Sequence, residues 1–346
     1  MDAQILVNAR SFGRRVTGVE RYSREVSSRL GSRVNLLGTS APQGFAGHWW
    51  EQLVLPTKTR GGKVLWSPAN SGPLAVSNQV VTIHDLSVID HPEWFESGFA
   101  IWYRILLPRL AKRANLVVTD SYYSKIRIQQ GFRISKEKII VAPCGVDREK
   151  FKPQSESRHD LVRRKYGLPK VYALYVGTLE PRKNLRRLIN AWARVEEEIQ
   201  PLELVIAGVS GRSFQKCQVY GSSSKRIKFV GYVADEDLPA LYSGARMYIL
   251  PSLYEGFGLT ALEAMACGTP VIASSSTAIP EVVGAAGLSV SPLDEVAIGT
   301  AMVTLWREAG LNEDLAHRGL RRIRAFTWER TAALVQQALD LAREKQ

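Results

Sequence analysis

The sequence predicts an α/β protein made of two doubly wound domains in series. Short runs rich in β-branched residues alternate with amphipathic segments, and this rhythm occurs twice along the chain. The chain has 346 residues, 45% of them hydrophobic and 23% charged, which is long enough for two separate cores. Alternating strands and helices favour parallel sheets covered by helices, with ligands bound beyond the carboxyl ends of the strands. We therefore expect two such sheets whose strand ends face a shared central cleft.

The first half of the chain is expected to form six strands and three helices. The strands are short apolar runs, at 4–8, 34–38, 63–66, 79–84, 115–119 and 138–142. The helices are segments whose apolar residues recur with helical spacing, at 19–30, 99–113 and 121–130.

The second half repeats this pattern. Its strands are expected at 171–177, 202–208, 226–231, 247–250, 270–273 and 288–290. Its helices are expected at 184–197, 237–244, 259–267, 280–283 and 295–308, followed by a last helix over 328–345. The charged stretch 150–169 lacks periodicity and is interpreted as a linker. The first domain is therefore expected over 1–155 and the second over 165–332.

A glycine-rich helix start in the second half is the most informative feature. After the apolar strand 247–250, Gly256 and Gly258 keep the turn free of side chains, and the helix 259–267 ends at Gly268. The free N–H groups and positive dipole end of such a helix suit a phosphate, which the glycines let approach the backbone.

Two glutamates, Glu255 and Glu263, lie eight positions apart around this helix start. One precedes the helix and the other lies about one turn inside it, so both can face a ligand that lies across the helix end. Carboxylates accept hydrogen bonds from vicinal hydroxyls, so a nucleotide-sugar fits this layout. An ordinary strand-turn-helix with a solvated glutamate at its start is the alternative.

The stretch from Pro251 to Pro270 resembles the E-x7-E signature of family 4 retaining glycosyltransferases, which have the GT-B fold. Other motifs of that family occur in the family's order, at 18–22, 84–86, 120–124, 143–147, 177–184 and 230–238. The resemblance implies an N-terminal acceptor-binding domain and a C-terminal donor-binding domain, both Rossmann-like. It also implies that the end of the chain, 333–346, packs back on the first domain. The G-T-L-E-P-R-K-N form of the loop at 177–184 resembles bacterial mannosyltransferases of polysaccharide and O-antigen assembly.

The resemblance also assigns roles to single residues. Glu263 would accept hydrogen bonds from the ribose hydroxyls, and Glu255 would contact hydroxyls of the transferred sugar. The donor would also contact a set of loop residues: Gly18, Thr178, Gly231, Tyr232, Val233, Gly256, Phe257, Gly258 and Leu259. Many relatives carry an arginine where this chain has Thr178. A buried Glu263 needs a ligand or a cationic partner, because burying a lone carboxylate is costly.

Three groups of basic residues are further candidates. Lys183 and Arg182 follow a strand end and would stabilise the negative charge that develops on the departing diphosphate. His84 ends a strand and, by resemblance, lies near the reactive face of the donor sugar. Arg14 and Arg15 would bind an acceptor phosphate. A solvated turn, a structural histidine and solvated arginines are the respective alternatives.

The charge and composition of the chain limit the classes of molecule that it is expected to bind. The net charge is +13, and residues 1–152 hold 22 Lys and Arg against 12 Asp and Glu. Such an excess attracts nucleic acid, phosphorylated substrates or an acidic membrane surface. The common nucleic-acid recognition motifs are absent from the sequence, so nucleic acid is not expected as a partner. The cysteines at 144, 217 and 267 indicate neither a disulfide framework nor a zinc site.

No metal and no cofactor are expected. Asp235-Glu236-Asp237 spells D-x-D, a motif that holds a divalent ion on sugar nucleotides elsewhere, but here it precedes Leu238 at a helix start. Acidic residues are favoured in a first helical turn by the helix dipole.

The expected location is the cytoplasm, with peripheral contact to the inner face of the cytoplasmic membrane. No apolar run reaches the roughly 18 residues that span a bilayer, and the chain starts directly with a strand. The segment 99–113 mixes aromatic and aliphatic residues with four cations. This composition suits either a helix packed on the sheet or a basic surface that rests on anionic lipid.

The favoured function is a retaining glycosyltransferase without a metal requirement. It would transfer a hexose, with mannose from GDP-mannose as the best guess, to a hydroxyl of a growing, lipid-linked glycan of the cell surface. By resemblance, acceptor and leaving group lie on one face and the departing phosphate oxygen helps to take the acceptor proton. A same-fold sugar-nucleotide epimerase or hydrolase and a basic nucleic-acid-binding protein without catalysis are the alternatives.

Overall fold

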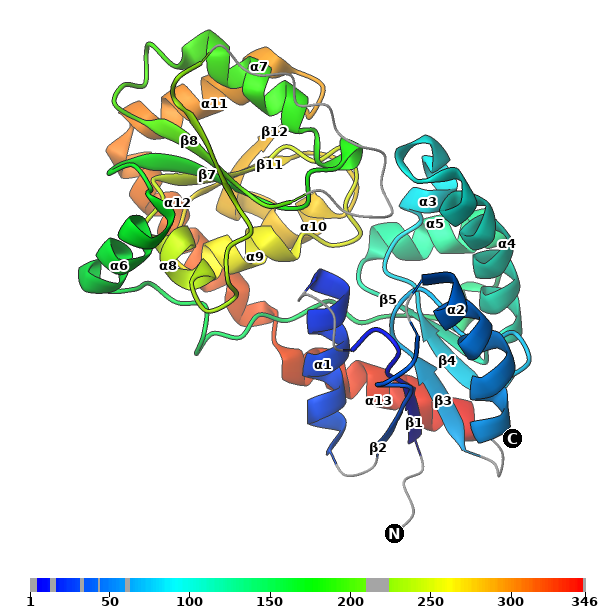
Figure 1. Ribbon diagram of the computed structural model, residues 1–346. Coiled ribbons are helices and arrows are strands. Elements are labelled where there is room, and N and C mark those ends of the chain that lie inside the picture. The colour runs from blue at the N-terminus through cyan, green and yellow to red at the C-terminus, as the bar shows by residue number, and fades with distance from the viewer. Residues whose placement is uncertain are drawn as a thin grey trace. The chain divides into compact units, whose positions relative to one another are not determined.

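The computed structural model describes residues 5–12, 17–31, 34–42, 44–59, 63–209 and 224–344. The chain forms two compact units, each built on a six-stranded sheet whose strands pair in parallel. Unit 1 comprises Met1–Pro92, Ser97–Gly145 and Phe326–Gln346, and unit 2 comprises Glu93–Glu96 and Val146–Ala325. The expected α/β architecture with two doubly wound sheets is confirmed (Figure 1).

The sheet of unit 1 has the strand order β2-β1-β3-β4-β5-β6. Its four inner strands are buried along their whole length, which explains their continuous apolar runs, whereas the two edge strands, β2 and β6, are partly exposed. They are β1 (Ile5–Asn8), β2 (Val34–Leu37), β3 (Val64–Ser67), β4 (Gln79–Thr82), β5 (Leu116–Thr119) and β6 (Ile139–Val141). Because β2 and β3 lie on opposite sides of β1, the winding direction reverses between β1 and β3.

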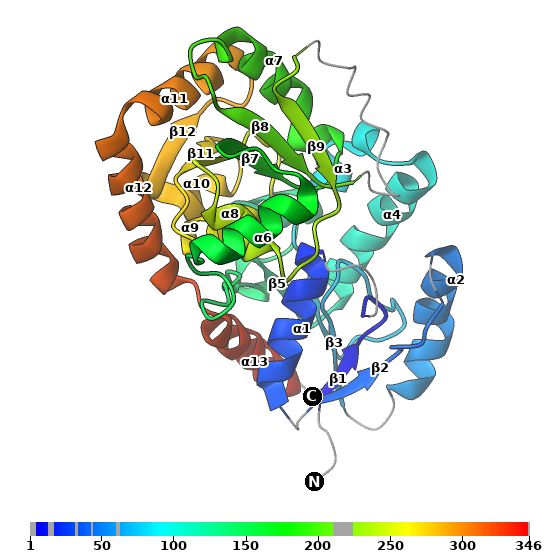
Figure 2. The same ribbon diagram turned by 60° about the vertical axis from the view of Figure 1, so that its left-hand side comes forward.

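Helices cover both faces of this sheet. The first and last helices, α1 (Gly18–Leu30) and α13 (Trp328–Glu344), pack side by side, and α13 also contacts β3 to β6 (Figures 1 and 2). The remaining helices include α3 (Ser87–Asp90), α4 (Ser97–Arg113) and α5 (Tyr122–Phe132), which contact one another in sequence.

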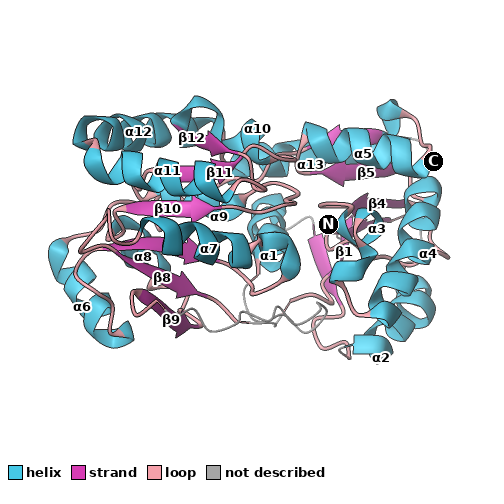
Figure 3. Ribbon diagram, turned by 90° about the horizontal axis from the view of Figure 1, so that it is seen from above, coloured by secondary structure: helices cyan, strands magenta, loops and turns pink. Residues whose placement is uncertain are grey.

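The sheet of unit 2 has the order β12-β11-β10-β7-β8-β9, so its winding reverses between β7 and β10. The strands are β7 (Tyr172–Val176), β8 (Glu203–Ala207), β9 (Ile227–Gly231), β10 (Met247–Leu250), β11 (Val271–Ser274) and β12 (Gly287–Val290). The strands of each unit lie side by side with helices around them (Figure 3).

The helices of unit 2 form two groups. On one face, α7 (Leu185–Val195) and α11 (Glu295–Arg307) pack together, and Trp192 and Met302 are fully buried in the core that they share with the strands. The other group is α8 (Leu238–Ser243), α9 (Leu259–Ala266) and α10 (Ile279–Val283), and α9 contacts both of its neighbours.

Four helical segments lie where the sequence analysis expected none. The supposed linker contains α6 (Glu156–Tyr166), which packs on α8 and ends at Gly167 in the left-handed conformation. The sequence pattern does not reveal this helix, because its residues are mostly polar and only Val162 is buried. The others are α3, α12 (Ala309–Arg322) and a continuous segment formed by α2 (Gly44–Trp49), a π-helical turn (Trp50–Val54) and a 3-10 turn (Leu55–Lys58).

Candidate functional site

The two loops singled out by the sequence meet at the reversal point of the unit 2 sheet. One loop follows β7 and the other follows β10, and these two strands are paired. The Leu253 amide donates to the Arg182 carbonyl across 2.7 Å. The Asn184 side-chain amide donates to the Pro251 carbonyl at 2.9 Å and to the Pro292 carbonyl at 2.6 Å. Ligands of doubly wound sheets bind at such reversal points, beyond the carboxyl ends of the strands.

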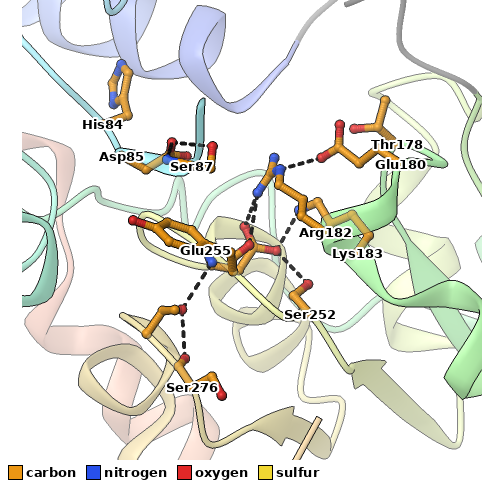
Figure 4. Close-up of polar contacts among 12 residues, drawn as sticks. His84, Asp85, Ser87, Thr178, Glu180, Arg182, Lys183, Ser252, Glu255 and Ser276 are labelled. Carbon is orange, nitrogen blue, oxygen red and sulfur yellow. Dashed lines mark hydrogen bonds and ion pairs between the residues drawn. The ribbon is translucent and has the colours of Figure 1, made fainter. Parts of the chain in front are cut away.

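Glu255 is the centre of a buried charge cluster (Figure 4). Its Oε1 accepts from Lys183 Nζ at 2.6 Å and from Ser252 Oγ at 2.8 Å, and its Oε2 accepts from Arg182 Nη1 at 3.1 Å. Its backbone amide donates to Thr277 Oγ1. Burial alone would raise the pKa of this carboxyl, but the charges of Lys183 and Arg182 lower it from 4.5 to about 2. The carboxylate therefore stays ionised, with a fixed orientation, at neutral pH.

A second carboxylate, Glu180, belongs to the same cluster and was missed by the sequence analysis. It is fully buried, and its Oε1 lies 2.6 Å from Arg182 Nε. Arg182 thus lies between two carboxylates, which fixes its guanidinium in one orientation (Figure 4). In the sequence, the signal that could have identified Glu180 was its position two residues before Arg182, in a loop at a strand end.

The helix start expected to hold the phosphate is formed as the glycines predict. Gly258 precedes α9 with φ of 106° and ψ of 42°, a left-handed conformation that side chains disfavour. Phe257 is buried beside it. The Ala261 and Leu262 amides donate to the Gly258 carbonyl, at 3.0 and 3.3 Å. The two amides before them, of Leu259 and Thr260, are therefore the candidates for binding an anion at this helix start.

Glu263 lies inside α9 and is only 3% exposed. Its Oε2 accepts from the Tyr242 hydroxyl at 3.1 Å. Burial, followed by the negative charge of Glu263, raises the pKa of Tyr242 well above 10, so the tyrosine remains a hydrogen-bond donor. The sequence analysis required a ligand or a cationic partner for a buried Glu263; the structure gives it a neutral donor, the tyrosine hydroxyl from α8.

The loop expected on the nucleobase side follows β9. Gly231 ends the strand with φ of 68°, and its carbonyl accepts from the Gly208 amide at 2.7 Å. Tyr232 exposes 46% of its surface, whereas Val233 is buried. A partly exposed aromatic ring therefore lies directly after this strand end.

His84 lies two residues after the end of β4 in unit 1, and both of its ring nitrogens have partners there. Nδ1 lies 2.6 Å from Asp120 Oδ2, and Nε2 lies 2.9 Å from the Pro68 carbonyl oxygen. Burial alone would lower the pKa of the imidazole, but the Asp120 carboxylate raises it, and a carbonyl partner requires a protonated Nε2. A hydrogen bond from either nitrogen to a sugar would require one of these contacts to break. Its neighbour Asp85 accepts from the amide and hydroxyl of Ser87 at the start of α3.

The expected N-terminal residues are only partly described. Gly18 is the first residue of α1, directly after Thr17, whose hydroxyl caps the helix by accepting from the Glu20 amide. Arg14 and Arg15 lie outside the described residues.

Both aspartates of the acidic run 235–237, which precedes α8, form ion pairs within the chain. Asp235 pairs with Lys150, and Asp237 accepts from Arg158, Lys165 and Tyr166. Within the described ranges, no group of three or more His, Cys, Asp or Glu side chains has the geometry to hold a metal ion. No helix in those ranges is long and apolar enough to cross a membrane.

Known proteins resemble both halves of this chain. Residues 170–308 match the family described as Glycosyl transferases group 1, and residues 63–150 match Glycosyltransferase Family 4. O-antigen chain mannosyltransferase B of Escherichia coli is 35% identical over 74% of this chain and 68% of that protein. The serotype-specific mannosyltransferase WbdA of Escherichia coli is 28% identical over 74% of this chain, which spans about a third of WbdA (32%).

Solved structures resemble the whole fold. HepE of Anabaena, determined in complex with UDP and glucose, superposes with a TM-score of 0.76. The alignment covers 98% of this chain and 99% of that one at 18% identity, which shows a shared fold. The sheets, the loops at the reversal point and the sequence relationship agree: this chain is a glycosyltransferase that belongs to family 4 and has the GT-B fold.

Proposed function

We propose that this glycosyltransferase moves mannose from GDP-mannose to a hydroxyl of a growing, lipid-linked cell-surface glycan, with retention of anomeric configuration. The choice of sugar and pathway is supported by the 35% identical O-antigen chain mannosyltransferase B. The observation that carries the chemistry is the Glu255 cluster beside the start of α9.

In this proposal, the diphosphate binds at the amides of α9 and near Lys183 and Arg182. Cleavage of the sugar–phosphate bond places negative charge on the departing phosphate, and fixed cations and amides stabilise that charge more than they stabilise the ground state. Glu263 accepts from the ribose hydroxyls, and Glu255 accepts from a hydroxyl of the sugar.

Glu255 is a poor candidate for a nucleophile or a base. Its pKa of about 2 makes it a weak base, and both of its oxygens are already held by cations. The proton of the acceptor hydroxyl therefore passes to the departing phosphate oxygen, which becomes more basic as the bond to the sugar breaks. Acceptor and leaving group then share one face of the sugar, which retains the configuration.

A screen of nucleotide-sugars tests the donor. We expect GDP-mannose to raise the melting temperature more than UDP-glucose or dTDP-glucose, because stabilisation grows with affinity. Radiolabelled mannose should then pass from GDP-mannose to a lipid-extractable glycan from bacterial membranes. A larger shift with a UDP-sugar would refute the donor. Release of free mannose at the same rate with and without acceptor would indicate a hydrolase instead.

A further inference from the structure

The helical segment Gly44–Lys58 in unit 1 carries apolar side chains on two faces. Leu55 is buried in a core with Leu6 and Leu65, but a second apolar face points outward. Three large apolar side chains are spaced four residues apart and face outward: Phe45 is 66% exposed, Trp49 is 61% and Leu53 is 62%. Residues four apart share one face of a helix, so these side chains form a single exposed stripe. A helix on a globular protein ordinarily turns such a face toward the core.

Polar contacts on the opposite face hold the segment in this orientation. Glu51 is 1% exposed, and its carboxylate accepts from Asn8 Nδ2 at 2.5 Å and from Ser71 Oγ. Arg10 Nε lies 3.5 Å from the same carboxylate. Gly47 faces inward too, where a Cβ would lie 2.9 Å from Arg10 Nη1. Asn8 ends β1 and Ser71 follows β3, so Glu51 ties the segment to the reversal point of the sheet.

The neighbouring helix α4 adds positive charge to this surface. Phe45 lies against Trp102 of α4, with ring centroids 6.5 Å apart, and the two segments are neighbours in Figures 1 and 3. On α4, Ile101 is 59% and Ile105 is 47% exposed. Four exposed cations accompany them on a helix without acidic residues: Arg104, Arg109, Lys112 and Arg113. The described part of the chain supplies none of these four with a salt bridge.

This surface differs from the one that the sequence suggested. The composition of 99–113 suited either a helix packed on the sheet or a basic surface that rests on anionic lipid. In the structure its aromatic residues pack inward for the most part: Tyr103 is 8% exposed, and Phe99 and Trp102 are half-buried. The exposed aromatic rings instead come from α2, which the sequence analysis did not expect.

We propose that the Phe45–Trp49–Leu53 stripe, together with the exposed face of α4, docks on an anionic membrane surface. Aromatic and aliphatic side chains enter the boundary between headgroups and acyl chains, while nearby cations bind lipid phosphates. Glu51, the acidic residue within Gly44–Lys58, is buried, and α4 has no acidic residue, so the exposed charges on these two segments are positive and complement an anionic bilayer. The exposed Glu96 lies just before α4, outside this surface. This inference rests on the proposed function, because a lipid-linked acceptor would be presented to the enzyme at a membrane.

Cosedimentation with vesicles tests this surface. The full chain is mixed with phosphatidylcholine vesicles, with or without phosphatidylglycerol, at low and high salt. We expect binding to the anionic vesicles that weakens with salt, because salt screens exposed charges. The double variant Trp49→Ser, Leu53→Ser should have an affinity for anionic vesicles that is lower by roughly tenfold or more. A matched control, Leu293→Ser with Val296→Ser, removes two similarly exposed apolar side chains from unit 2 (65% and 63%) and should bind like the parent.

Three results would overturn the proposal: equal binding by the parent and the Trp49/Leu53 variant, equal binding to neutral and anionic vesicles, or no binding. Sedimentation velocity without lipid adds a fourth, because self-association that the variant abolishes would assign the stripe to a second copy. The melting-temperature shift with GDP-mannose is measured on the same proteins. If the parent shows the GDP-mannose shift but does not bind vesicles, or binds them no better than the Trp49/Leu53 variant, only the surface is refuted. If vesicle binding behaves as expected but GDP-mannose gives no shift, only the donor is refuted.

Discussion

Replacing Glu255 with glutamine removes one charge from the buried cluster and keeps the size of the side chain. Lys183 is 8% exposed, so it would lose its carboxylate partner without gaining water. Removing one member of a buried ion pair costs about 3–5 kcal/mol. The lowering of the Glu255 pKa from 4.5 to about 2 corresponds to about 3 kcal/mol, which agrees. We expect the variant to lose about 3 kcal/mol of unfolding free energy at pH 7.

The pH dependence of this loss has a defined sign. The pKa of Glu255 is lower in the folded protein than in the unfolded chain, so its contribution is fully present above about pH 4.5. It disappears as the pH falls through about 2, where the folded carboxyl takes up a proton. The difference in unfolding free energy between wild type and variant should therefore be constant near neutrality and shrink below pH 4.5.

Catalysis and binding should respond differently to the same change. Lys183 and Arg182 lose an internal anion, so GDP should bind at least as tightly to the variant. Turnover should fall by on the order of a hundredfold or more, because a charged hydrogen bond to the sugar is lost. Urea unfolding, GDP titration calorimetry and radiolabelled transfer measure the three quantities.

A matched control is Glu198→Gln, the same change in an exposed ion pair with Arg307 at 3.0 Å. It should alter the unfolding free energy by less than about 0.5 kcal/mol. Wild-type turnover in the Glu255 variant, or a stability change no larger than that of the control, would refute the reasoning.

Four further outcomes are expected. Glu263→Ala should weaken GDP binding at least tenfold, since its carboxylate meets the ribose; an unchanged dissociation constant would make Glu263 structural. Glu180→Gln should lower the unfolding free energy by about 3 kcal/mol, because Arg182 loses one of its two buried carboxylate partners. It should reduce kcat and change KM less; a stability equal to that of the wild type in urea unfolding contradicts this. Transfer should survive EDTA, and loss that magnesium restores would reveal a missed ion site. NMR of the product's anomeric proton should show an α-linkage from the α-linked donor, and inversion would exclude the proposed mechanism.

Local sequence patterns were enough to predict elements that are buried uniformly or that need a glycine at one position. Strands such as β5 (Leu116–Thr119) are buried on both faces, so their residues form a continuous apolar run that is visible without the fold. The helix start at Gly258 was also predictable, because a left-handed residue before a helix favours glycine. The helix α6 was missed because it buries one residue and therefore has almost no apolar period.

By itself, the sequence determined the two-domain α/β class, the family, and the loops that carry Lys183 and Glu255. Only the tertiary structure decided which charges meet, since Arg182 and Glu255 are 73 positions apart and come together through the pairing of β7 with β10. The orientation of the segment Gly44–Lys58, which leaves the Phe45–Trp49–Leu53 stripe exposed, has the same cause. Its buried face includes the carboxylate of Glu51 beside the apolar Leu55. Asn8, which ends β1, and Ser71, which follows β3, supply the hydrogen bonds that Glu51 needs, and periodicity within one segment cannot contain that information.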